Sequence, residues 1–167
     1  MIKNTPKFEY ICCPLHKYTF SITPIRLWVE KECEGKVLNL FSGKTKLNID
    51  EIRNDIDESM PADFHLDALD AIQLMKTRKY KFNTIILDPP YSYRKSMEKY
   101  NGKIMSPFRQ LKDLIPDILK PFGKVITFGY HSNVMGKNRG FIIEKICLFS
   151  HGGAIHDTIA SVERKIK

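Results

Sequence analysis

Helical and strand-like patterns alternate along this chain, and this alternation restricts the possible fold more than any other feature. Residues 68–78 carry apolar side chains at the spacing of one helix face and lead directly into a β-rich apolar run, 82–87. A second helical pattern, 108–119, ends at a Lys-Pro-Phe-Gly sequence, 120–123, and an apolar run over 125–130 follows. Because helices of this kind connect parallel strands, the sequence predicts an α/β protein with a mostly parallel sheet.

Further apolar runs predict the rest of the sheet. Residues 37–41 form a short buried strand, and residues 51–55 and 64–66 are weaker strand candidates. Runs 141–149 and 158–162 flank a Gly-Gly turn and predict a C-terminal antiparallel hairpin. Together with the two strands above, these make a sheet of seven strands. The length of 167 residues suits one domain spanning residues 1–167.

The composition indicates which kind of binding partner and which cellular compartment to expect. Lysine and arginine outnumber aspartate and glutamate by 27 to 19, which gives a net charge of +8 and favours a polyanion such as nucleic acid. No apolar run is long enough to span a bilayer, and the N-terminus lacks the apolar core of a signal peptide, so we expect a cytoplasmic protein. The four cysteines contain no Cys-x-x-Cys pair, and we expect neither a metal nor a disulfide.

The tetrapeptide Asp88-Pro89-Pro90-Tyr91 stands where the strand 82–87 ends. Proline fixes φ and has no N–H, so the carbonyl groups of Asp88 and Pro89 are kept out of a helical turn. The Asp88 carboxylate and the Pro89 carbonyl can then accept both hydrogens of an amino group on a planar heterocycle while Tyr91 stacks on the ring. An ordinary Pro-Pro loop, with Asp88 as a capping residue and Tyr91 packed on the surface, is the alternative.

Polar residues also follow the other predicted strands. Ser42-Gly43 comes after the strand 37–41, Asp55 and Asp57 come after the next strand, and Asp67 comes after the third. In open α/β sheets, ligands bind beyond the carboxyl ends of the strands, where the strand order reverses. A glycine there lets a ligand approach the backbone, and an acid after the second strand can bind both hydroxyl groups of a ribose. The series predicts a nucleoside pocket, although each residue alone also suits a plain turn.

On these residues the chain resembles the class I S-adenosylmethionine-dependent methyltransferases, and among them the DNA adenine-N6 methyltransferases. Asp88-Pro89-Pro90-Tyr91 is similar to the family's catalytic D-P-P-Y motif, residues 38–43 to its first cofactor motif, and residues 54–57 to its acidic ribose motif. Asp67 matches the acid that binds the adenine of the cofactor, and residues 21–24 look like the T-P segment that closes over the methionine end.

The resemblance implies a Rossmann-like fold, S-adenosylmethionine as cofactor, and direct methyl transfer catalysed by Asp88, Pro89, Pro90 and Tyr91. Residues 1–35 would cover the cofactor. The implied cofactor site consists of Thr23, Pro24, Asn39, Phe41, Ser42, Gly43, Asp55, Asp57, Asp67 and Asp88.

Two departures from the family pattern follow from the same comparison. Gly43 is followed by Lys44-Thr45-Lys46 without a second glycine, and Asp55 comes only twelve residues after Gly43, so the first crossover helix is expected to be shortened or missing. Lys44 or Lys46 would then hold the methionine carboxylate, unless both are solvated surface lysines. The resemblance also leads us to expect a minimal form without a target-recognition domain, in which target choice comes from short loops or a partner subunit, or is loose, with a homodimer or a separate target-recognition subunit as the expected partner.

Cations and aromatic residues predict the substrate surface. The stretch after the catalytic motif mixes both kinds of side chain, as a nucleic-acid strand would require, although a solvated loop would look the same. Two histidines near predicted strand ends are further candidates, with a structural role as the alternative. The predicted substrate residues are Tyr93, Arg94, Lys95, Lys99, Tyr100, His131 and His151.

The Asp-Pro-Pro-Tyr motif does not identify the substrate. DNA adenine is the favoured target, and it must be flipped out of a duplex or already be single-stranded. The alternatives are an RNA adenine, a cytosine N4 or guanine N2 amine, and a non-catalytic nucleic-acid-binding subunit of a methyltransferase complex.

Overall fold

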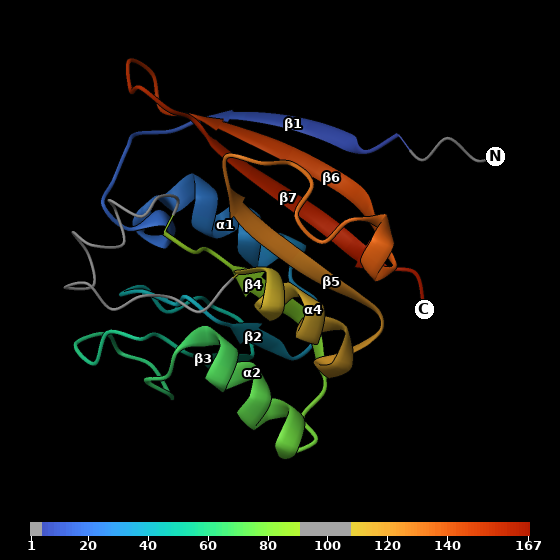
Figure 1. Ribbon diagram of the computed structural model, residues 1–167. Coiled ribbons are helices and arrows are strands. Elements are labelled where there is room, and N and C mark those ends of the chain that lie inside the picture. Colours follow the sequence, from blue (N-terminus) through green and yellow to red (C-terminus); the bar gives the residue numbers. More distant parts are fainter. Residues whose placement is uncertain (1–4, 91–107) are drawn as a thin grey trace.

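The computed structural model describes residues 5–90 and 108–167, and its seven strands form one mixed sheet in the order β1-β6-β7-β5-β4-β2-β3 (Figure 1). Strand β7 runs antiparallel to both of its neighbours, and the other neighbouring pairs are parallel. The predicted α/β class with a C-terminal antiparallel hairpin is confirmed. The strands are β1 (Lys7–Cys12), β2 (Val37–Asn39), β3 (Glu51–Arg53), β4 (Phe82–Leu87), β5 (Leu119–Gly129), β6 (Phe141–Ser150) and β7 (Thr158–Lys165).

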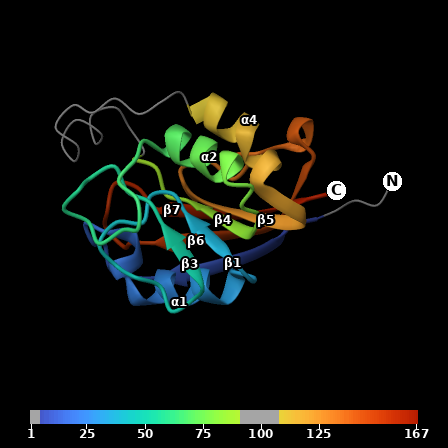
Figure 2. The ribbon, with the colours of Figure 1, turned by 90° about the horizontal axis from the view of Figure 1, so that it is seen from below.

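The helices cover both faces of the sheet. Figure 2 shows α1 (Thr23–Glu32) on one face, and α2 (Ala68–Thr77) and α4 (Phe108–Ile118) on the other. Successive residues of the central strands therefore serve different layers: Leu38 and Ile85 belong to the core under α2 and α4, whereas Val37 and Ile86 belong to the core under α1. This double burial explains why both faces of the central strands carry apolar residues. No helix within residues 5–90 and 108–167 is long and apolar enough to cross a membrane.

Local signals explain where the helices begin. Asp67 precedes α2, and its side chain accepts a hydrogen bond of 2.9 Å from the backbone N–H of Leu69, which caps the helix. Pro24 lies in the first turn of α1, where a missing N–H costs no helical hydrogen bond. Two short 3₁₀ helices, η1 (Thr19–Ser21) and η2 (Lys137–Arg139), complete the structure.

The first part of the chain differs from the prediction. Strand β1 and helix α1 were not predicted, and β1 supplies the seventh strand by pairing with β6 at the edge of the sheet. The predicted strand 64–66 is wrong, because only Phe64 forms a bridge, with Asn54. Its polar neighbour Asp67 therefore follows a loop rather than a strand.

The helix α4 ends just before the Lys-Pro-Phe-Gly sequence 120–123, as predicted, but these four residues belong to β5, which therefore starts earlier than the predicted strand 125–130. Phe82 pairs with Leu119 and Thr84 pairs with Lys124, so β5 contains a bulge opposite β4. Phe122 has a φ of 58°, and this unusual backbone conformation accommodates the extra residues. The strand thus starts directly at the end of α4.

The connection from β2 to β3 confirms the expected loss of the first crossover helix. Residues 40–50, which the structure describes in full, contain no helix. The fully buried side chain of Glu51 organises this connection instead. Its carboxylate accepts the Leu47 N–H at 2.9 Å and the Asn39 Nδ2 at 3.0 Å, and it lies 3.5 Å from Nε of Arg53.

Candidate active site

The strand ends that carry the predicted site residues meet at one place. Strand β2 lies between β3 and β4, and the chain proceeds from β2 to β3 on one side and from β4 to β5 on the other, so the strand order reverses there. A cavity of about 960 Å³ opens at this point. Small-molecule sites usually measure roughly 300–1,000 Å³. The predicted catalytic and cofactor residues that line it are Phe41, Ser42, Gly43, Asp55, Asp57, Asp88, Pro89 and Pro90.

The remaining walls come from two segments: one lies within residues 1–35, which were expected to cover the cofactor, and the other is the β6–β7 loop, of which only His151 was a predicted site residue. One wall is the segment between β1 and α1, including Tyr18 and Phe20, and another is formed by Tyr130 after β5 and by the β6–β7 loop. The hydroxyl groups of Ser21 and Thr45 lie 2.8 Å apart and join the first wall to the Gly43 loop. Residues 16–20 contain closely spaced aromatic and histidine side chains, which were the available sequence signal for the first wall, but they show no periodicity.

The Gly43 turn is held by two hydrogen bonds of Gly43 itself. Gly43 has a φ of 57°, its N–H donates to Oδ2 of Asp55 at 2.8 Å, and its carbonyl accepts from Nη2 of Arg53 at 2.8 Å. The other oxygen of Asp55, Oδ1, accepts the Asp57 N–H at 3.0 Å. A carboxylate has about four acceptor positions, so Asp55 can fix the turn and keep about two of them for a ribose.

Asn54 joins the strand ends around the cavity. Its Nδ2 donates to the carbonyls of Leu40 at 3.2 Å and Leu66 at 3.0 Å, and its Oδ1 accepts the Leu66 N–H at 3.2 Å. The backbone carbonyl of Asn54 accepts the Ser42 N–H at 3.0 Å. Asn54 is 1% exposed and acts as a positioning residue, which the sequence pattern alone does not reveal.

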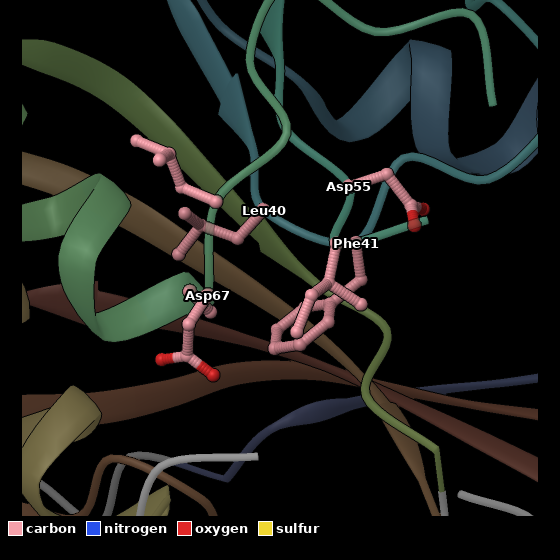
Figure 3. A pocket seen from close by; sticks show the side chains of 7 residues that line it. Leu40, Phe41, Asp55 and Asp67 are labelled. Carbon is pink, nitrogen blue, oxygen red and sulfur yellow. The ribbon is translucent and has the colours of Figure 1, made fainter. Parts of the chain in front are cut away.

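Asp67 lies at a smaller pocket beside the main cavity. Figure 3 shows Leu40, Phe41, Asp55 and Asp67 at this pocket, with the two carboxylates pointing in different directions. Phe41 and Asp55 line both spaces. The pocket holds about 10 Å³, close to the space of one water molecule, so in this structure it is too small for an aromatic ring.

Several predicted residues lie away from the cavity lining. Thr23 and Pro24 start α1, whereas the neighbouring Ile22 and Ile25 line the cavity. Asn39 is buried within β2 and bonds to Glu51. His131 is exposed after β5, and within the described chain its neighbour Tyr130 lines the cavity instead. The remaining predictions, Tyr91, Tyr93, Arg94, Lys95, Lys99 and Tyr100, lie outside the described residues.

His151 lines the cavity but is already engaged in the protein. Its Nε2 lies 2.9 Å from Oγ1 of Thr158, and its Nδ1 lies 3.6 Å from Sγ of Cys13. Burial raises the pKa of the Cys13 thiol, so this cysteine is a neutral packing group and not a thiolate nucleophile. The geometry favours the structural role for His151, and a substrate contact remains a prediction.

Comparison with solved structures identifies the fold. The SAM-dependent methyltransferase from Agrobacterium tumefaciens matches with a TM-score of 0.56 and 17% identity, over 85% of this chain and 59% of its own. SMU.776, whose structure contains SAH, matches with a TM-score of 0.59 and 13% identity, over 84% of this chain and 48% of its own. TrmN from Thermus thermophilus matches with a TM-score of 0.56 and 14% identity, over 86% of this chain and 49% of its own.

The chain therefore has the Rossmann-like fold of S-adenosylmethionine-dependent methyltransferases. It spans between 48% and 59% of the length of these three proteins. No family model matches the chain, and no curated protein sequence matches it. At 13–17% identity the likeness concerns the fold, so the reaction must be argued from the site.

Proposed function

We propose that this protein is an S-adenosylmethionine-dependent methyltransferase that methylates the exocyclic N6 amine of adenine in DNA. The observation that carries the proposal is the position of Asp88, Pro89 and Pro90. They follow β4 where the strand order reverses, and they line the same cavity as Ser42 and Asp55. A nucleoside cofactor and an amino group can meet only where these two sets of residues face one space.

The residues present fit the proposed cofactor. Ser42 lines the cavity, and its hydroxyl is buried without a hydrogen-bond partner in the described part of the chain, which makes it a candidate to bond to a ligand. The Gly43 N–H is already donated to Asp55, and the exposed Lys44 lines the cavity whereas Lys46 does not. Lys44 is therefore the better candidate for the methionine carboxylate, and Asp55 for the ribose.

In this reaction the protein contributes mainly by positioning the reacting groups. When bound, the cofactor supplies a methyl group on a positively charged sulfur. The Asp88 carboxylate and the Pro89 carbonyl accept the two hydrogens of the target amine, which frees its lone pair from the ring and directs it toward the methyl group. Asp88 can also accept the proton that the amine must lose. Tyr91, which lies outside the described residues, is proposed from the sequence to stack on the base.

Transfer of labelled methyl groups tests the proposal. Duplex DNA, heat-denatured DNA and RNA would each be incubated with labelled S-adenosylmethionine and digested to nucleosides. We expect N6-methyladenine in DNA. Label confined to RNA would indicate RNA adenine as the substrate. The absence of both methyl transfer and cofactor binding would point to a non-catalytic subunit.

Two variants separate the roles within the site. Asp88→Ala should abolish transfer and leave cofactor affinity nearly unchanged, because Asp88 is assigned to the amine. Asp55→Ala should weaken cofactor binding more than Asp88→Ala does, in a titration followed by thermal shift. The reverse order of affinities would contradict both assignments.

A further inference from the structure

The loop between β6 and β7 presents an isoleucine at the mouth of the cavity. Ile155 is 93% exposed and lines the cavity together with His156 and Asp157 of the same loop. Leu15, from the segment between β1 and α1, is 64% exposed and lines the cavity as well. Single exposed apolar residues are common, but two aliphatic side chains at the mouth of one cavity indicate a surface that is covered during function.

The base of this loop is fixed although its tip is exposed. The His151 N–H donates to Oδ1 of Asp157 at 3.0 Å, which closes the loop, and the His151 ring lies 2.9 Å from the Thr158 hydroxyl. The rings of His156 and Tyr130 lie 5.1 Å apart between centroids, which holds the residue after Ile155 against the end of β5. Ile155 is thus an apolar side chain on an anchored support.

The chain as a whole suits a polyanion, because it carries a net charge of +8. At the cavity, the exposed Lys17 and Lys44 stand beside four acids, Asp55, Asp57, Asp88 and Asp157, so these two lysines are the cavity-lining cations that phosphates would contact. Cations that contact phosphates around an apolar tip are typical of proteins that insert a side chain between base pairs.

We infer that Ile155 is a wedge that enters a duplex beside the target and helps the adenine leave the base stack. The inference rests on the proposed function, because it assumes that the cavity receives a base. Flipping a paired base costs a few kcal/mol, and an apolar side chain that fills the vacated space offsets part of that cost. A base that is already unstacked needs no wedge.

This difference defines the experiment. Wild-type protein, Ile155→Ala and the control Ile166→Ala would be compared on unmethylated genomic DNA, either native or heat-denatured, so that no recognition sequence has to be known. Ile166 is 45% exposed and, among the described residues, is not part of the cavity lining. For Ile155→Ala we expect transfer to native DNA to fall by about tenfold or more, and transfer to denatured DNA to change by less than about twofold. Ile166→Ala should match the wild type on both.

A second readout does not depend on methyl transfer. Fluorescence of 2-aminopurine, placed at a modified adenine mapped with the wild type, rises when that base leaves the stack, and we expect a smaller rise with Ile155→Ala. Equal losses on native and denatured DNA, or a wild type active only on denatured DNA, would overturn the wedge while leaving the proposed function intact. No transfer by the wild type to any nucleic acid would overturn the proposed function, and this inference with it.

Discussion

Replacing Asn54 by leucine should loosen the strand ends that form the candidate active site. The change keeps a similar volume but removes three side-chain hydrogen bonds, two to the carbonyls of Leu40 and Leu66 and one from the Leu66 N–H. These backbone groups then lose partners at a place where Asn54 itself is 1% exposed. The expected result is a less stable protein with a less ordered cofactor site.

The expected loss can be worked from the burial of each bond. The bond to Leu40 is buried, and an unsatisfied buried group costs about 1–3 kcal/mol. The two bonds to Leu66 are partly buried, so water can replace them and each contributes about 0.5–1.5 kcal/mol. The sum lies between about 2 and 6 kcal/mol, with a midpoint of about 4 kcal/mol of unfolding free energy. For a chain of this size the midpoint corresponds to a Tm lower by about 8–16 °C.

Urea unfolding followed by tryptophan fluorescence measures this loss. Trp28 is the single tryptophan, and its ring packs edge-on against Phe128 and Phe149 at centroid distances of 6.2 and 5.5 Å, so its emission should report on the core. Asn48→Leu is the control, because Asn48 is exposed in the same β2–β3 connection and its replacement should cost less than about 0.5 kcal/mol.

The reasoning would be refuted by a small difference between the two variants. If Asn54→Leu lost less than about 1 kcal/mol relative to Asn48→Leu, the strand ends would hold their positions without the Asn54 hydrogen bonds. A cofactor titration at a temperature where both variants are folded gives the second measure. Since Asn54 is not part of the described cavity lining, weaker binding by Asn54→Leu would reflect a displaced Gly43 turn.

Three further predictions concern other parts of the molecule. Lys44→Gln should weaken cofactor binding about two- to fivefold in a titration, whereas Lys46→Gln should leave it unchanged, because only Lys44 of the two lines the cavity; equal effects would contradict the assignment. Glu163 is fully buried, and its carboxylate accepts three backbone N–H groups of the loop 134–136 at 2.9–3.1 Å. Glu163→Gln should therefore cost about 2 kcal/mol more in urea unfolding than Glu144→Gln on the partly exposed surface, and equal costs would refute this role. An indole N–H and two lysines lower the pKa of Glu9 to about 2, so its stabilisation is present above about pH 4.5 and is lost as the pH falls toward 2. Glu9→Gln should flatten the acid side of a plot of stability against pH, and an unchanged slope would show that Glu9 does not contribute there.

The parts of the fold that were predicted correctly depend on local patterns. The periodicity of α2 and α4, the run of β4 and the hairpin of β6 and β7 are visible within short windows of sequence. The wrong or missing parts depend on partners far along the chain. Strand β1 is largely exposed and forms because it pairs with β6, whose residues follow it by about 140 positions. The β5 bulge exists because the pairs Phe82–Leu119 and Thr84–Lys124 lie two residues apart on β4 but five residues apart on β5.

For the site, the sequence determined which residue types stand at the strand ends. A glycine after β2, acids after β3 and an Asp-Pro-Pro sequence after β4 are local features, and parallel strands bring their carboxyl ends to one edge. The tertiary structure decided which of these residues share a cavity, and it specified which residues of the predicted N-terminal cover, 15–25, and of the β6–β7 loop form the other walls. It also assigned Asn54 and His151 to supporting roles. The physical reason is that a side chain's role depends on the hydrogen-bond partners that folding brings to it, and those partners come from distant segments of the chain.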